Sequence, residues 1–210
     1  MLEAIDLECS RGSRTLFSGL AFELKSGELL HVAGANGSGK TSLLRILCGL
    51  LEPLAGEVRW KGTATRVLAE DYRRDLIYIG HSNGVKDDLT PAENLRVACT
   101  LCGLSPPREA IEGALEAFGL ARHHDAPVKA LSQGQRRRVA LARLAIADRH
   151  PLWLLDEPWN ALDEDATRHV QTLIDGHLER GGIVVMTSHQ PLAARAGGTV
   201  RTLELPRAAA

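Results

Sequence analysis

The sequence lacks any hydrophobic run long enough to cross a membrane as a helix. Its main apolar runs, around Leu29, Leu152 and Ile183, are each far shorter than the roughly 20 residues that such a span needs. The first six residues are acidic and patterned like a strand, so no secretory signal is expected. These features predict a soluble chain, folded as one domain with at most a modest lobe, that reaches a membrane only through a partner.

An excess of charge of either sign is also missing. The 25 lysines and arginines nearly balance the 26 aspartates and glutamates, which leaves a formal net charge of −1. We therefore expect no nucleic acid among the partners. Three consecutive arginines at residues 136–138 could form a basic patch, but no aromatic residues alternate with them. We interpret the run as a helix face with one or two structural arginines.

Cysteine is scarce, with four residues in the chain. Cys99 and Cys102 have the C-x-x-C spacing, but they lie within a predicted helix. A zinc site would need a second pair, and a redox motif would need a βαβ context. The four cysteines are expected to be reduced thiols.

One glycine-rich segment has the context of a phosphate-binding loop. An apolar run at residues 29–33 reads as a strand, and residues 42–50 have helical spacing. Between them lie Gly34, Ala35, Asn36, Gly37, Ser38, Gly39, Lys40 and Thr41. Backbone N–H groups of such a loop, and the helix N-terminus after it, favour phosphate. Lys40 can reach the β- and γ-phosphates and Thr41 can ligate Mg²⁺, so the segment predicts a nucleoside triphosphate site.

Strand-like and helix-like segments alternate around a helix-rich insert. Strands are expected at residues 2–7, 20–24, 29–33, 57–60, 76–79, 152–155 and 183–187, and helices at 42–50, 90–102, 109–118, 135–147 and 165–178. This alternation predicts an α/β fold with a parallel sheet and ligands at the carboxyl ends of its strands. We expect a single nucleotide-binding domain, with its core at 1–88 and 139–205 and a small helical lobe at about 89–138.

Two carboxylates follow the strand expected at 152–155. In P-loop NTPases an aspartate at such a strand end helps hold Mg²⁺ beside the loop threonine, which is the role expected of Asp156. Glu157 projects elsewhere and is placed to act as the general base that accepts a proton from an attacking water. His189 follows the strand at 183–187, where it could contact the γ-phosphate or fix that water.

A second phosphate-binding pattern, Leu-Ser-Gln-Gly-Gln, occupies residues 131–135 before a predicted helix. The Ser132 hydroxyl and the Gly134 N–H can face a phosphate, and the helix dipole points the same way. Because Lys40 and the first helix already serve the loop of this chain, the second pattern suggests a γ-phosphate held by another subunit.

Five motifs therefore occur in one order: the P-loop, residues 131–135, Asp156-Glu157, Ala-Leu-Asp at 161–163 and Thr-Ser-His at 187–189. In this the sequence resembles ATP-binding cassette (ABC) ATPases over nearly its whole length. The resemblance implies a RecA-like P-loop NTPase core with a small helical lobe, and a head-to-tail homodimer that binds ATP and Mg²⁺. Each site would combine Ser132 and Gly134 of one chain with Lys40, Thr41, Asp156, Glu157 and His189 of the other. Asp163 would couple the two sites.

Two positions depart from the family pattern. About 23 positions before the P-loop, where the family has an aromatic ring for the adenine, this chain has Arg11, whose planar guanidinium can stack but grips less specifically. The family's glutamine after the strand at 76–79 is replaced by His81. Since Mg²⁺ prefers oxygen ligands, His81 is expected to act through water or on a transporter partner.

Within the family, the chain looks like the ATP-binding subunits of cytochrome c maturation systems, the haem exporters. The residues that carry this likeness include Gly80-His81, Asp156-Glu157-Pro158-Trp159-Asn160 and the segment 187–192. The resemblance implies an ATPase that energises haem export or the handling of a haem chaperone. It implies an integral membrane subunit, two copies of each subunit, further maturation subunits, and a place on the cytoplasmic face of the bacterial inner membrane.

Three other functions stay open. The chain could be the ATPase of another ABC exporter. A soluble ABC clamp on nucleic acid or a ribosome usually needs two cassettes and basic inserts, which are not evident here. A small P-loop kinase would leave residues 132–135 and His189 unexplained.

Overall fold

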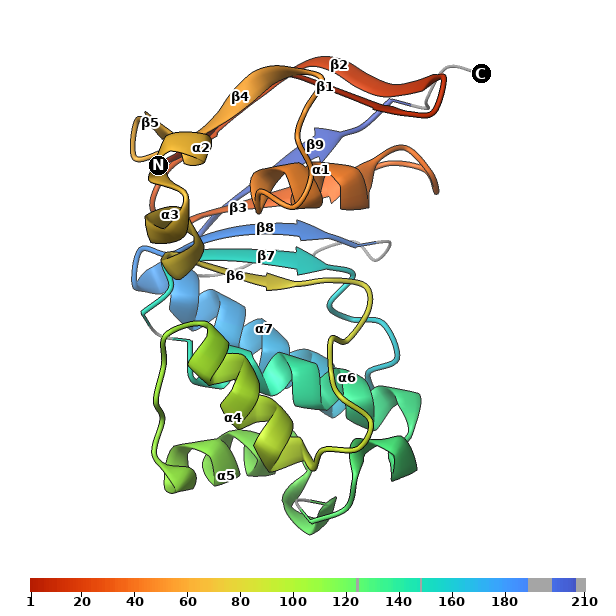
Figure 1. Ribbon diagram of the computed structural model, residues 1–210, viewed down its shortest axis with the longest axis vertical. Coiled ribbons are helices and arrows are strands. Elements are labelled where there is room, and N and C mark those ends of the chain that lie inside the picture. Colours follow the sequence, from red (N-terminus) through yellow and green to blue (C-terminus); the bar gives the residue numbers. More distant parts are fainter. Residues whose placement is uncertain (124, 148, 189–197, 207–210) are drawn as a thin grey trace.

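A computed structural model describes residues 1–123, 125–147, 149–188 and 198–206, and within them the chain forms two sheets (Figure 1). The first is antiparallel, with the strand order β2-β1-β4-β5. Its strands are β1 (Leu2–Arg11), β2 (Arg14–Leu24), β4 (Ala55–Trp60) and the short β5 (Thr63–Ala64). Burial along β1 follows the alternation of a strand with one face toward a core.

The second sheet is parallel throughout, with the order β6-β7-β8-β3-β9. Its strands are β6 (Leu76–Ile79), β7 (Leu152–Asp156), β8 (Ile183–Thr187), β3 (Glu28–Ala33) and β9 (Thr199–Glu204). Every residue of β7 and β8 is buried, as expected for strands covered on both faces. The predicted parallel sheet is therefore confirmed, with β8 beside β3.

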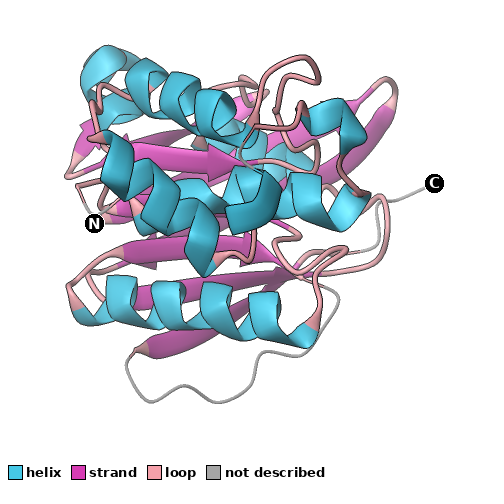
Figure 2. Cartoon of the chain, turned by 90° about the horizontal axis from the view of Figure 1, so that it is seen from below, coloured by secondary structure: helices cyan, strands magenta, loops and turns pink. Residues whose placement is uncertain are grey.

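Helices cover both faces of the parallel sheet. α1 (Lys40–Leu47) lies between the two sheets, and α7 (Glu164–Glu179) lies on the opposite face of the parallel sheet (Figure 1). Seen from below, helices lie in front of the strands (Figure 2). Below α7 lie α4 (Pro91–Leu101), α5 (Arg108–Ala117) and α6 (Gln133–Leu141). The remaining elements are α2 (Thr65–Leu68), α3 (Glu70–Arg74), η1 (Ala121–His123), η2 (Val128–Ala130) and η3 (Ala142–Ala145).

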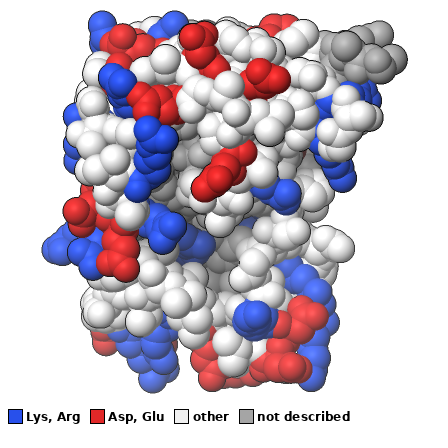
Figure 3. Space-filling view, turned by 45° about the horizontal axis from the view of Figure 1, so that its top comes forward, with Lys and Arg blue, Asp and Glu red and all other residues white. Residues whose placement is uncertain are grey.

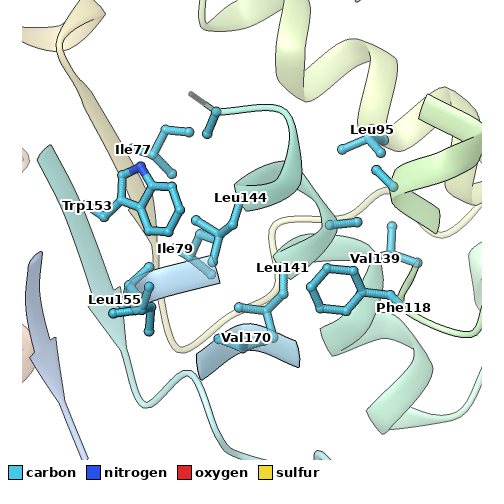
Figure 4. Packing of buried hydrophobic residues seen from close by; sticks show 14 of the residues in the cluster. Ile77, Ile79, Leu95, Phe118, Val139, Leu141, Leu144, Trp153, Leu155 and Val170 are labelled. Carbon is cyan, nitrogen blue, oxygen red and sulfur yellow. The ribbon is translucent and has the colours of Figure 1, made fainter. Parts of the chain in front are cut away.

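Two hydrophobic clusters form the core. One fills the space between the sheets around α1. The other lies on the far face of the parallel sheet and runs without a break through α7 into α4, α5 and α6. Figure 4 shows Trp153 and Leu155 of β7, Val170 of α7 and Phe118 and Leu95 of the helical region in this second cluster. The lobe boundaries predicted at about 89–138 remain a prediction, and the helices there share the core of the sheet.

Several predicted elements need correction. The helix expected at 135–147 begins at Gln133, because Ser132 caps it, and it tightens into η3 after Leu141. The first helix ends at Leu47 rather than at residue 50, and Gly49 then adopts a left-handed φ of 72°. Cys102 is the C-cap of α4 and not a mid-helix residue. All four cysteines are free thiols, as expected.

A buried histidine makes the stability of the fold depend on pH. His177, in the last turn of α7, is 3% exposed, and its ring stacks on Trp153 at 3.9 Å between centroids and 8° between planes. Gly182 faces it so closely that a Cβ there would lie 2.2 Å from His177 Nε2. Burial lowers the pKa of His177 from 6.5 to about 4.

We expect the free energy of unfolding to fall as the pH drops from about 6.5 toward 4. Between these pH values His177 is protonated in the unfolded chain but stays neutral in the folded chain. The free energy of unfolding should therefore decrease by about 3 kcal/mol across this range. Urea unfolding at several pH values would measure it, with His177→Phe as the comparison. His150, whose pKa is also lowered by burial, is unchanged in both proteins. Identical pH profiles for the two proteins would contradict the assignment to His177.

Candidate nucleotide-binding site

The P-loop lies between the end of β3 and the start of α1, and its glycines are needed where the backbone turns. Gly39, the N-cap of α1, has a φ of 105°, and a Cβ there would lie 3.1 Å from Leu16 Cβ. A Cβ at Gly34, whose φ is 141°, would lie 2.8 Å from Ser38 Oγ. Side chains at these two positions would therefore strain or block the loop.

Lys40 folds back over the loop. Its Nζ donates hydrogen bonds to the carbonyl oxygens of Gly34, at 2.8 Å, and Ala35, at 3.2 Å, and the residue is only 8% exposed. The ammonium thus lies within the turn formed by the loop, beside the N-terminus of α1. A positive charge and free helical N–H groups together favour an anion at this point.

The carboxylate of Asp156 connects the P-loop helix to two strands. Thr41 Oγ1 donates to its Oδ2 at 2.9 Å, and Thr187 Oγ1 donates to its Oδ1 at 2.8 Å. Asp156 is 1% exposed and lies at the end of β7, while Thr187 ends β8. The structure therefore brings Asp156 and Thr41 together, as the sequence predicts.

Glu157 turns away from the direction of β7. Its φ is 50°, in the left-handed region that side-chain-bearing residues seldom adopt, and its backbone N–H donates to Thr187 Oγ1 at 2.8 Å. Such an outlier is characteristic of functional sites held in place by their surroundings. Because the backbone turns at Glu157, the side chains of Asp156 and Glu157 can point in different directions.

A hollow of about 440 Å³ opens at this edge of the sheet. It is lined by Arg11, Leu16, Asn36, Gly37, Gly39, Lys40, Thr41, Ser42, His81, Asp156, Glu157 and Asn160. The hollow thus brings together the predicted P-loop residues and the two carboxylates. It also contains Arg11 at the end of β1 and His81 just after β6, the two residues that depart from the family pattern. Asn160 was part of the family likeness but was not predicted as a site residue. It returns to the hollow because its N–H donates to the Glu157 carbonyl in a turn, which no pattern of apolar spacing could indicate.

Ser132 and Gly134 lie elsewhere. Among the described residues that line the hollow, none comes from 131–135. Ser132 is the exposed N-cap of α6 and forms a capping box with Gln135, each side chain bonding the other's backbone N–H. A Cβ at Gly134 would lie 2.6 Å from the Ala161 carbonyl oxygen, which explains the glycine. The second phosphate-binding pattern is therefore apart from the loop of its own chain.

The three arginines after this pattern have structural contacts, which confirms their interpretation as a helix face. Arg136 pairs with Asp87, Arg138 pairs with Asp163, and Arg137 is buried on backbone carbonyls. On the face shown in Figure 3, basic and acidic side chains are intermixed.

His81 borders two hollows. Besides the one at the P-loop, it lines a groove of about 450 Å³ together with Leu50, Tyr78, Asn83 and Arg143. Leu50 is 69% exposed there. His189, predicted as a site residue, lies outside the described residues.

Comparisons with known proteins agree with these motifs. A family profile described as ABC transporter matches residues 17–160, more than half of the chain. The cytochrome c biogenesis ATP-binding export protein CcmA of Dechloromonas aromatica is 54% identical over 205 residues, covering 98% of this chain and 100% of that protein. The protein of the same description from Pseudomonas aeruginosa is 49% identical, covering 96% of this chain and 98% of its own.

Solved structures give the same fold. A dimeric ATP-binding cassette in a post-hydrolysis state, bound to ADP and Pi, has a TM-score of 0.83 and 27% identity, covering 100% of this chain and 98% of that one. An ABC transporter ATP-binding protein from Pyrococcus furiosus has a TM-score of 0.80 and 26% identity, covering 97% and 96%. The predicted α/β P-loop fold with helical lobe is thereby confirmed. No helix of the described residues is both long and apolar enough to span a bilayer.

Proposed function

Because this chain belongs to the ABC transporter family and is an ATP-hydrolysing subunit, we propose that it energises an export complex of c-type cytochrome biogenesis. The complex would export haem or release a haem-loaded chaperone. The observation that carries the ATPase chemistry is the convergence of Lys40, Thr41, Asp156 and Glu157 on one hollow. The biogenesis role is supported by about 50% identity, over nearly full length, to proteins described as cytochrome c biogenesis ATP-binding export proteins.

ATP and Mg²⁺ fit the residues present. The loop offers N–H groups and the Lys40 ammonium to the phosphates, and the paired oxygens of Thr41 and Asp156 are the ligand type that Mg²⁺ prefers. When bound, the ion would neutralise charge on the β- and γ-phosphates. Thr187 holds Asp156 from the other side, so the carboxylate is oriented before any ligand binds.

Glu157 is proposed as the general base. It would take the proton of the attacking water as the water oxygen bonds to the γ-phosphorus and the bond to the β-phosphate oxygen breaks. The bond from the Glu157 N–H to Thr187 fixes the backbone from which its carboxylate extends. His189 is proposed to contact the γ-phosphate or to hold the water.

Each site is proposed to be completed by a second copy of the chain. Ser132 and Gly134 of one protomer would contact the γ-phosphate held by the other, in a head-to-tail homodimer. Their position away from the hollow of their own chain supports this arrangement. Arg11 would stack on the base, and its guanidinium grips less selectively than an aromatic ring.

An integral membrane subunit, present in two copies, is proposed as the partner that places the chain at the cytoplasmic face of the bacterial inner membrane. Further cytochrome c maturation subunits would join this complex. His81 is proposed to contact the membrane subunit. The support is that His81 borders both the hollow at the P-loop and the groove that contains the exposed Leu50.

Purification of the tagged protein from native membranes tests the proposal. We expect an integral membrane subunit and maturation subunits to copurify, and deletion of the chain to abolish covalently bound haem in c-type cytochromes. Lys40→Ala is the matched control, since it should assemble normally yet fail to restore the cytochromes. Copurification with the membrane subunit of an unrelated exporter, and normal cytochromes in the deletion strain, would contradict it.

A further inference from the structure

Helix α6 is hydrogen-bonded to the segment that carries Glu157. We call residues 157–163, between β7 and α7, the catalytic segment. Arg137 donates to the carbonyl oxygens of Asp156 and Glu157, both at 2.9 Å, where this segment starts. Arg138 donates to the Asp163 carboxylate at 2.5 Å, where it ends. In between, Gly134 packs directly against the Ala161 carbonyl.

The Arg137 side chain also reaches a second loop. Its Nη1 donates to the Gly80 carbonyl at 2.8 Å and to Asn83 Oδ1 at 3.3 Å, on either side of His81. The residue is 2% exposed, and burial lowers the pKa of its guanidinium, although Asp156 and Glu157 oppose that shift. One buried cation thus fixes the backbone beside Glu157 and the loop of His81.

Stability alone is a poor reason to keep such a cation. Moving a charge out of water costs several kcal/mol, and well-packed apolar residues often replace buried ionic groups at no loss of stability. A guanidinium does what an apolar side chain cannot, because its planar fork sets the relative positions of several carbonyl oxygens. This favours a role in geometry over one in packing.

The same short helix begins with the proposed phosphate contacts. Ser132 is the N-cap of α6, Gly134 lies in its first turn, and Arg137 follows within the next turn. The backbone hydrogen bonds of α6 join these positions, so we expect the helix to move as one body. A displacement of its N-terminus therefore moves the carbonyl groups that Arg137 holds.

We propose that Arg137 is a positioning residue that links the phosphate contact at Ser132 and Gly134 to Glu157 of the same chain. The link rests on the proposed function, in which those two residues touch the ATP of the partner's site. Engagement of one site would then align the general base of the other, so the two sites of a dimer would hydrolyse ATP cooperatively. Arg138 supports the link by holding the far end of the catalytic segment.

The test compares Arg137→Lys and Arg137→Met with the wild type in the intact complex. We expect kcat to fall by about 10- to 100-fold and the Hill coefficient for ATP to drop toward 1, because the base is misaligned. The equilibrium Kd for ATP should stay within about threefold, because no P-loop contact changes. A residue that served only stability would lower the melting temperature without changing the Hill coefficient.

Arg136→Gln is the matched control. Arg136 lies on the same helix and bonds Asp87 and the carbonyls of Leu131 and Lys129, but none of its bonds reaches the catalytic segment. It should keep the wild-type kcat and Hill coefficient. Wild-type values in both Arg137 variants would overturn the link.

If the Arg137 variants do not fold, two variants of Arg138 test the proposal instead. Arg138→Gln removes the ion pair with Asp163, and Arg138→Lys retains a charge there. We expect the glutamine variant to lose cooperativity and the lysine variant to recover it, and equal cooperativity in the two would overturn the proposal. Absence of ATP hydrolysis in the wild-type complex would instead contradict the proposed function itself.

Discussion

Glu157→Gln is expected to lower the turnover of ATP by about 10²–10⁴ fold while ATP still binds. The amide keeps the shape of the side chain but cannot take the proton of the attacking water. The P-loop contacts of Lys40 and Thr41 are unchanged, so affinity should be retained. Without hydrolysis, the ATP-bound dimer should also persist. Steady-state kinetics, equilibrium nucleotide binding and light scattering with ATP would measure the three effects.

Glu164→Gln provides the control for this substitution. Glu164 is an exposed residue in the first turn of α7, outside the hollow, so the same chemical change there should leave turnover near that of the wild type. Wild-type turnover in Glu157→Gln would remove Glu157 as the base.

Pairing Ser132→Arg with Lys40→Ala should show which chains form each site. When both substitutions lie on one chain of a tagged heterodimer, each of the two shared sites contains one defect. When they lie on different chains, both defects fall in the same site and the other site is intact. We therefore expect the second arrangement to hydrolyse ATP severalfold faster than the first, because a bulky arginine or a lost ammonium disables the phosphate contacts in both sites of the first arrangement.

The opposite order would contradict shared sites. If one chain formed a complete site alone, the heterodimer with both substitutions on one chain would keep an intact partner and would be the faster. A single-chain control, with only Ser132→Arg on one protomer, should be at least as fast as the arrangement on different chains, because it also keeps one intact site and its other site carries one defect instead of two. The comparison needs no assumption about the cargo, since ATP hydrolysis is the readout.

Most of the site could be predicted because its residues follow local rules. A glycine-rich turn between an apolar strand and a helix has few uses, and Asp156 ends a strand whose other residues are all apolar. The parallel sheet then brings such strand ends to one edge, so Thr41 and Asp156 meet although they are far apart in sequence.

Other parts depend on contacts that a single sequence does not reveal. β9 pairs with β3, but most residues of β9 are exposed, so its sequence has no apolar pattern that could have predicted a strand. Asn160 reaches the hollow through one turn, and Arg137 gains its partners from two loops distant in sequence. The early start of α6 could have been predicted, because Ser132 and Gln135 have the spacing of a capping box. The roles of Arg11, His81 and His189 remain predictions.

The hydrogen bonds from Lys40 to the carbonyls of Gly34 and Ala35 have a consequence for how a nucleotide enters. The loop is already wrapped around the Lys40 ammonium. When a triphosphate binds, this ammonium exchanges the carbonyl oxygens of the loop for phosphate oxygens, and no flexible segment has to become ordered. Association then carries little entropic penalty from ordering of the loop itself.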